Sequence, residues 1–344
     1  MSTLTETRRT WIHAPASDLV FFGYGWLVVL LPLLWLDAWA PVVVLVILMV
    51  NDLHRHYTFV LVYGEREEFE KRKSLYIGLP ILAALVAFAF VYADSFPILL
   101  TISVLWTIYH SVGQKYGITR IYARKAGYGD AWIEKGLIFS WFYYVVFAIA
   151  EKEAATLERF DAGRVVLGYI GEALPYMTVI SDLILAVALV FVVLFVRQEY
   201  VNRHRMSVAK VLYVVSILLL YSLFFRSLVL GYVVFGFSHA IEYIALVNIF
   251  VGNKYLKRPE ARSLLARAAR RLWLSSSLFG LGIVALCAAA KGWHQQAFTI
   301  YIVGSGFLHF IYDGLIWKVR KPEVGAPLGI HYDASLPKPM ASVG

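Results

Sequence analysis

Apolar stretches, each about as long as a membrane-spanning helix, follow one another along almost the whole chain. A bilayer core roughly 30 Å thick requires about 20 apolar residues per helix. The pattern predicts ten spans, near residues 19–37, 40–63, 75–93, 97–118, 132–150, 177–196, 208–226, 228–252, 272–290 and 297–318. We therefore expect an all-α, polytopic integral membrane helix bundle over residues 19–318, with an N-terminal segment at 1–18 and a tail at 319–344.

The polar connections between these spans alternate in charge. Those at 65–73, 115–130, 197–210 and 253–271 are rich in Lys and Arg, whereas the alternate connections contain few basic residues. If the N-terminus is inside, 26 of the 32 Lys and Arg residues lie on the inner side. The positive-inside rule then places both termini in the cytoplasm, and we expect a bacterial inner (plasma) membrane.

Composition narrows the class of protein further. The chain is 60% hydrophobic and 16% charged, which leaves little room for a soluble domain. Its net charge of +9 does not indicate nucleic-acid binding, because the basic residues lie in the loops on one side of the spans. The single cysteine, Cys287, excludes an intramolecular disulfide and a CxxC motif.

Five of the nine histidines lie within predicted spans, and all five are on spans that run from outside to inside. They are His54 and His56 on the second span, His110 on the fourth, His239 on the eighth and His309 on the tenth. Each lies 11 to 16 residues from the outer end of its span, which is a depth of about 17 to 24 Å at 1.5 Å per residue. The sequence thus predicts one histidine layer in the cytoplasmic half of the bilayer.

Ionisable side chains at such depth normally face the bundle interior and meet a partner, an ion or water. Spacings of three or four residues give four of these histidines a polar neighbour on the same helix face. These neighbours are Asp52 for His56, Gln114 for His110, Glu242 for His239 and Asp313 for His309.

The second span offers two histidines that point in nearly opposite directions. His54 and His56 are separated by about 200° around a helix, and His56 ranks slightly higher as a ligand because it shares a face with Asp52. A two-metal site or a locally unwound helix would use both. We expect Arg55 to pair with Asp52, to snorkel toward the cytoplasm, or to contact an anionic group of a substrate or lipid.

The donor set suits a transition metal. Neutral imidazole and carboxylate bind Fe, Zn, Cu or Ni, and the absence of thiolate argues against an iron–sulfur cluster. The candidate ligands are His54, His56, His110, His239, His309, Glu242 and Asp313, with Tyr243 and Tyr312 as neighbours that can hydrogen-bond to them.

A site of this kind within hydrocarbon has access to lipid-soluble substrates and to dioxygen. Our first hypothesis is one or two Fe²⁺ ions in an oxygenase that hydroxylates, desaturates or oxidatively cleaves an apolar substrate. The chain has no Gly-rich nucleotide motif, so electrons would come from an electron-donor protein or from the substrate itself.

Three other functions use the same residue types. A zinc-dependent lipid hydrolase would use three histidines, with Glu242 or Asp313 as general base; the absence of HExxH disfavours a protease. A metal- or proton-coupled transporter would also place such groups near the bilayer midplane. Facing histidines also ligate haem, although the carboxylates fit a free metal better.

Two short phrases on late spans carry a family resemblance. Phe237-Ser238-His239 and His309-Phe310-Ile311-Tyr312-Asp313 resemble phrases of the bacterial membrane-bound carotene-cleaving dioxygenases of the Brp/Blh type. The resemblance implies iron bound by His239 and His309, and a retinal-forming cleavage of carotenoids. The chain lacks a Pro-His-Gly followed by Asp on an early span, a His-x-x-x-His around His239, and the histidine boxes of fatty-acid desaturases.

Overall fold

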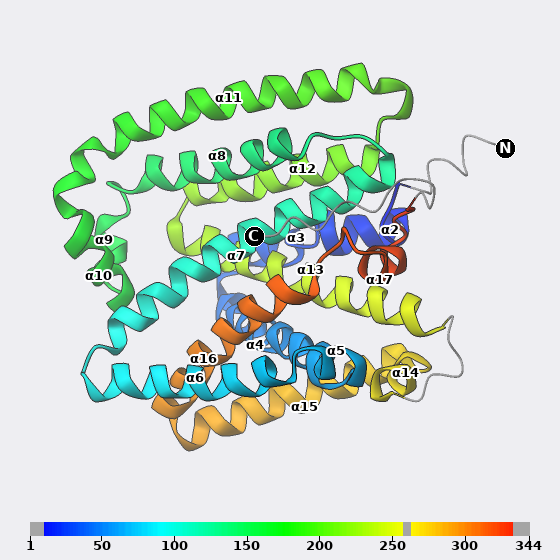
Figure 1. The fold of residues 1–344 in the computed structure, drawn as a ribbon. Coiled ribbons are helices and arrows are strands. Elements are labelled where there is room, and N and C mark those ends of the chain that lie inside the picture. Colours follow the sequence, from blue (N-terminus) through cyan, green and yellow to red (C-terminus); the bar gives the residue numbers. More distant parts are fainter. Residues whose placement is uncertain (1–9, 257–262, 333–344) are drawn as a thin grey trace.

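In a computed structural model of the protein, residues 10–256 and 263–332 are described (Figure 1). Within these ranges the chain is helical and contains no strand. Nine helices are long and apolar enough to cross a membrane, or ten if a bent N-terminal pair counts as one span. The predicted all-α polytopic bundle is therefore confirmed for the described residues. Residues 1–9, 257–262 and 333–344, which belong to the predicted N-terminal segment, a basic connection and the tail, lie outside them.

The elements follow the predicted spans closely. The long apolar helices are α4 (Ala40–Tyr63), α6 (Lys73–Tyr92), α7 (Phe96–Ala126), α8 (Ala131–Ile149), α11 (Met177–Val201), α12 (Val208–Ser222), α13 (Leu228–Leu256), α15 (Leu272–Trp293) and α16 (Gln295–Ile316), and α3 (Leu27–Trp35) is the second half of the bent N-terminal pair. The shorter helices are α2 (Pro15–Asp18), α5 (Arg66–Lys71), α9 (Ala154–Leu157), α10 (Asp161–Ile170), α14 (Leu264–Ala269) and α17 (Pro322–Gly325). Short π or 3₁₀ turns cover Leu19–Gly23, Asp37–Trp39, Gly171–Tyr176, Arg203–Arg205, Leu223–Phe225 and Ala326–Leu328.

Burial of the apolar helices divides the bundle into a centre and a periphery. In the apolar stretch of α13, 61% of the residues are buried inside the protein, whereas the corresponding shares for α6 and α15 are 11% and 6%. Apolar surface that faces no protein requires lipid around it. Figure 1 shows α13 in the middle of the bundle, with α11 and α15 at opposite edges.

The first span is bent rather than continuous. The helical segment Pro15–Gly23 and helix α3 meet at 53°, where the sequence predicts one uninterrupted helix over 19–37. Gly25 lies at the bend, and a Cβ there would overlap the Val20 carbonyl oxygen and lie 2.8 Å from Ile241 Cδ1. Close packing of the bend against α13 therefore requires glycine at this position.

Helix α7 continues well past the predicted end of its span. The connection predicted over 115–130 is helical as far as Ala126, and Gly127 (φ 71°) then ends the helix in the left-handed conformation. Helix α7 thus has buried residues in a part of the sequence that hydropathy alone assigns to a loop.

Buried ion pairs hold the ends of α7, α8, α11 and α12 together. Arg120 pairs with Glu134, and Lys210 Nζ lies 3.4 Å from Glu134 and 2.6 Å from Glu199. The phenol of Tyr128 donates to Glu199. Burial, reinforced by the Glu199 carboxylate, raises the pKa of Tyr128, so the phenol stays a donor. Each buried charge in this cluster has a partner, as buried charges require.

Candidate metal centre

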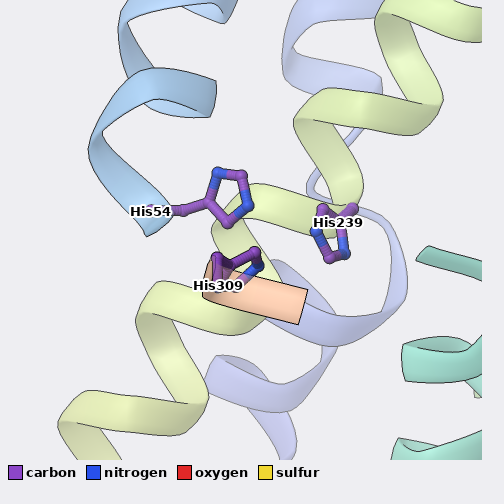
Figure 2. Close-up of side chains that lie close together, drawn as sticks. All are labelled: His54, His239 and His309. Atoms are coloured by element: carbon purple, nitrogen blue, oxygen red, sulfur yellow. The ribbon is translucent and has the colours of Figure 1, made fainter. Parts of the chain in front are cut away.

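Four of the five predicted histidines meet at the centre of the bundle, one each from α4, α7, α13 and α16. The ring centroid of His54 lies 4.8 Å from that of His239 and 4.9 Å from that of His309. The ring of His110 lies 4.9 Å from His309 and 5.3 Å from His239. Figure 2 shows the rings of His54, His239 and His309 gathered around one point.

Several ring nitrogens in this cluster have no hydrogen-bond partner although they are buried. Among the described residues they are both ring nitrogens of His54 and His239, and Nε2 of His110 and His309. One ligand nitrogen from each of His54, His239 and His309 lies within 4.8 Å of the others. Buried polar atoms are nearly always satisfied, so these unpaired nitrogens, aimed at a common space, are suited to hold a cation.

Hydrogen bonds orient the imidazole of His309. Its Nδ1 lies 2.7 Å from Thr58 Oγ1, which lies 3.0 Å from Asp313 Oδ1. If Nδ1–H donates to Thr58 and the Thr58 hydroxyl donates to Asp313, the unprotonated Nε2 faces the cluster. Ligand histidines are commonly oriented in this way through their second ring nitrogen.

Asp313 lies between His110 and His309. Its Oδ2 is 3.5 Å from His110 Nε2 and 3.7 Å from His309 Nδ1, while Oδ1 accepts from the Tyr243 phenol at 2.6 Å. One ligand atom from each of His110, His309 and Asp313 forms a second group within 4.8 Å. This group shares His309 with the first, so the arrangement offers donors for one or two ions.

Glu242, a predicted ligand, is engaged elsewhere. Its Oε1 lies 2.6 Å from Lys115 Nζ, and Oε2 accepts from Gln114 Nε2 at 3.1 Å. Gln114 also donates to the carbonyl oxygen of His239 at 2.9 Å. Gln114, which contacts both Glu242 and the main chain of His239, therefore fixes the helical turn that carries His239. Glu242 belongs to neither group of candidate ligands.

The predicted order of His54 and His56 is reversed in the structure. His56 Nδ1 lies 2.7 Å from the main-chain oxygen of Asp52, and its Nε2 lies 2.5 Å from the Tyr301 phenol, away from the cluster. The rotation of α4 against its neighbours turns His54 inward instead, while the Asp52 carboxylate lies 3.6 Å from Arg55. The predicted pairing of Arg55 with Asp52 is thus present.

The other predicted neighbours have separate partners. Arg55 also donates to the carbonyl oxygen of Ile302 at 2.7 Å. The phenol of Tyr312 lies 2.8 Å from that of Tyr63 and donates to the carbonyl oxygen of Tyr76 at 3.4 Å. Tyr243 contacts the cluster through Asp313, whereas Tyr312 connects α16 to α4 and α6.

Two alanine variants on α4 separate these positions. We expect His54→Ala to lose most of its bound metal, because it removes a nitrogen from the cluster. His56→Ala should retain the metal, since it removes only the contacts with Asp52 and Tyr301. Elemental analysis of both purified variants measures the difference, and the opposite pattern would restore the order predicted from the sequence.

Two cavities reach the cluster from opposite ends of these helices, the first lined by residues of all four and the second by residues of α7, α13 and α16. One, of about 280 Å³, lies toward their N-terminal ends and is lined in part by His54, His239 and His309, with Arg55 in its wall. The other, of about 340 Å³, lies toward their C-terminal ends and reaches His110 and Asp313. We call the second the α7–α16 cavity.

Two residues of the site were missed by sequence reasoning. Thr58 follows His54 by four residues and so shares its helix face, a signal that spacing provides. Lys115 was assigned to a cytoplasmic connection because it begins a basic stretch, yet only 1% of its side chain is exposed.

A comparison of the chain with family models, curated proteins and solved structures finds no match in any of the three.

Proposed function

We propose that the histidine cluster binds a transition metal and that the protein is a membrane metalloenzyme, a non-haem iron oxygenase acting on a hydrophobic substrate. The observation that carries the proposal is the convergence of unpartnered ring nitrogens from four helices in the bundle interior. Buried polar atoms are nearly always satisfied, and a bound metal ion would supply the partner that these nitrogens lack.

The number and type of donors support iron ahead of zinc. Catalytic zinc sites normally use three protein ligands and one water. Here His54, His239 and His309 form one group, and His110 and Asp313 add two further donors beside them. Four imidazoles and one carboxylate suit an ion of higher coordination number, such as Fe²⁺.

The protein residues have distinct tasks in this proposal. Bound iron would supply the capacity to activate dioxygen. Thr58 and Asp313 hold His309 in one orientation. The Lys115–Glu242 pair keeps two charges neutralised next to the site, and Gln114 fixes the main chain at His239. The cavities admit an apolar substrate while the bundle keeps bulk water away.

Oxidative cleavage is the reaction that needs the fewest partners. Cleaving a carbon–carbon double bond with dioxygen gives two carbonyl products and places one oxygen atom in each, so no external electrons are consumed. Hydroxylation leaves one oxygen atom in the product and one in water, and takes two electrons and two protons from an electron-donor protein. The resemblance to the Brp/Blh dioxygenases favours cleavage, and a carotenoid as its substrate.

The two cavities favour a second candidate, a metal- or proton-coupled transporter. Alternating access requires a site that opens to each side of the membrane in turn, and cavities toward opposite ends of the helices would suit such a site. A zinc-dependent lipid hydrolase would instead use Asp313, beside His110, as general base.

Metal analysis of the purified protein tests the proposal. We expect about one or two metal ions per chain, mainly iron, and dioxygen consumption that depends on reduced metal. Chelation should lower the melting temperature, because a ligand that binds only the folded state stabilises it by mass action.

No metal above background after supplementation would contradict the proposal. Bound zinc with oxygen-independent turnover would favour the hydrolase. Metal uptake into sealed vesicles without turnover would favour the transporter.

A further inference from the structure

The α7–α16 cavity is open toward the surface that faces lipid. Trp106 and Tyr109, which line it, have 41% and 55% of their surface exposed. Three other lining residues are glycines, Gly113, Gly117 and Gly314, and an added Cβ at each would meet nothing within 4 Å. A hydrocarbon chain can therefore enter sideways from the bilayer and lie along the glycine surface.

The size and lining of this cavity suit an apolar ligand. Its volume is about 340 Å³, and typical ligand pockets have volumes of about 300–1,000 Å³. Such pockets are lined mainly by apolar side chains with a few polar groups. Phe310 and Trp317 contribute aromatic walls, and the polar groups His110 and Asp313 belong to the candidate metal centre. The apolar part of a ligand would thus lie directly against the proposed metal.

Two arginines follow residues that line the other end of the cavity. Ile121 and Val319 line this end, and Arg124 follows Ile121 by three residues on the same helix face, while Arg320 follows Val319 directly. Arg124 Nε is buried without a hydrogen-bond partner. Arg320 is exposed.

Within residues 10–256 and 263–332, no carboxylate forms an ion pair with either of these two arginines. Arg124 is repelled by the charges of Arg120 and Arg320. Among the ion pairs between described residues, Arg120 has Glu134 as its partner, whereas Arg124 and Arg320 have none. Guanidinium groups bind phosphate and carboxylate through paired hydrogen bonds, so an anionic group at this position would meet unused donors.

We propose that the α7–α16 cavity binds a lipid with an anionic head group, held by Arg124 and Arg320, with its chain directed toward His110 and Asp313. The inference rests on the proposed function, for which it names the substrate class. From Arg124 back to His110, α7 covers about 21 Å at 1.5 Å per residue. A long-chain amphiphile can span that length. It takes the place of the carotenoid that the Brp/Blh resemblance implies, because a carotene has no charged group for the two arginines to bind.

Lipid binding to the purified full-length protein tests the inference. The probes are phosphatidylglycerol, phosphatidylcholine with the same acyl chains, and inorganic phosphate, titrated in detergent with the melting temperature as readout. Phosphatidylglycerol should stabilise the protein at concentrations at least tenfold below those of phosphatidylcholine. Phosphate alone should have no effect.

Variants then separate the head group from the chain. Arg124→Gln with Arg320→Gln should weaken phosphatidylglycerol binding at least tenfold, and replacing both by Lys should restore part of it. Gly117→Leu should weaken binding of both lipids because it fills the cavity. Arg203→Gln, which changes an exposed arginine on another connection, is the matched control and should bind as the wild type does.

Equal binding of the two lipids, or unchanged phosphatidylglycerol binding in the double Gln variant, would overturn the inference. An effect of phosphate as strong as that of phosphatidylglycerol would overturn the lipid assignment in favour of a soluble anion. Metal content is measured in parallel. A wild type without metal whose lipid binding still depends on Arg124, Arg320 and Gly117 would refute the proposed function and leave the lipid site standing.

Discussion

His239→Ala and His309→Ala are expected to lose bound metal and to reduce oxygen-dependent turnover by more than about 100-fold, because losing even a hydrogen-bonding partner of a ligand costs about 10- to 100-fold. Each variant removes a buried nitrogen of the central group. His309→Ala also releases Thr58 from its contact with Nδ1. Elemental analysis and an oxygen electrode measure the two effects.

The exposed His204, in the turn between α11 and α12, provides the matched control. His204→Ala should keep wild-type metal content and turnover. Size-exclusion profiles and helical circular dichroism establish that all three variants remain folded. Full metal content in both cluster variants would show that the histidines are a packing feature and would end the metalloenzyme proposal.

Lys115→Met is expected to lower the free energy of unfolding by about 3–5 kcal/mol, because it leaves Glu242 buried without its charge partner. The two side chains are 2.6 Å apart and each is 1% exposed, so water cannot replace the lost partner. Gln114 and Ser238 still contact the carboxylate but carry no charge. Unfolding in mixed micelles, followed by tryptophan fluorescence, measures the change.

Two further variants make the cause of this destabilisation testable. Lys115→Met combined with Glu242→Gln should recover most of the stability, since neither charge remains in the interior. Lys135→Met, which changes an exposed lysine on α8, should differ little from the wild type. A double variant as unstable as Lys115→Met alone would mean that packing, rather than charge, is lost at residue 115.

Sequence patterns predicted the helices and the gathering of His110, His239 and His309 for clear physical reasons. Hydrophobic length identifies a span without reference to its neighbours. A histidine deep within a span is placed near the bundle interior by the cost of exposing it to lipid. Both arguments concern one helix at a time, and for that reason they succeed.

Properties that depend on neighbouring helices were harder to predict. The choice between His54 and His56 depends on how α4 is rotated against α13 and α16, which a single helix does not encode. Lys115 was misplaced because its partner, Glu242, lies on another helix far along the chain. At the bend near Gly25, Ile241 of α13 likewise lies where a Cβ would be. Each of these errors involves a long-range contact that periodicity cannot report.

The distribution of the four histidines over α4, α7, α13 and α16 has a consequence for biogenesis. Spans enter the membrane in chain order, and His309 lies on the last apolar helix among the described residues. A metal held by the whole cluster can therefore be loaded only after α16 has been inserted and has packed against α4 and α7. Metal delivery would then act as a late checkpoint, distinguishing fully assembled molecules from chains whose insertion stopped early.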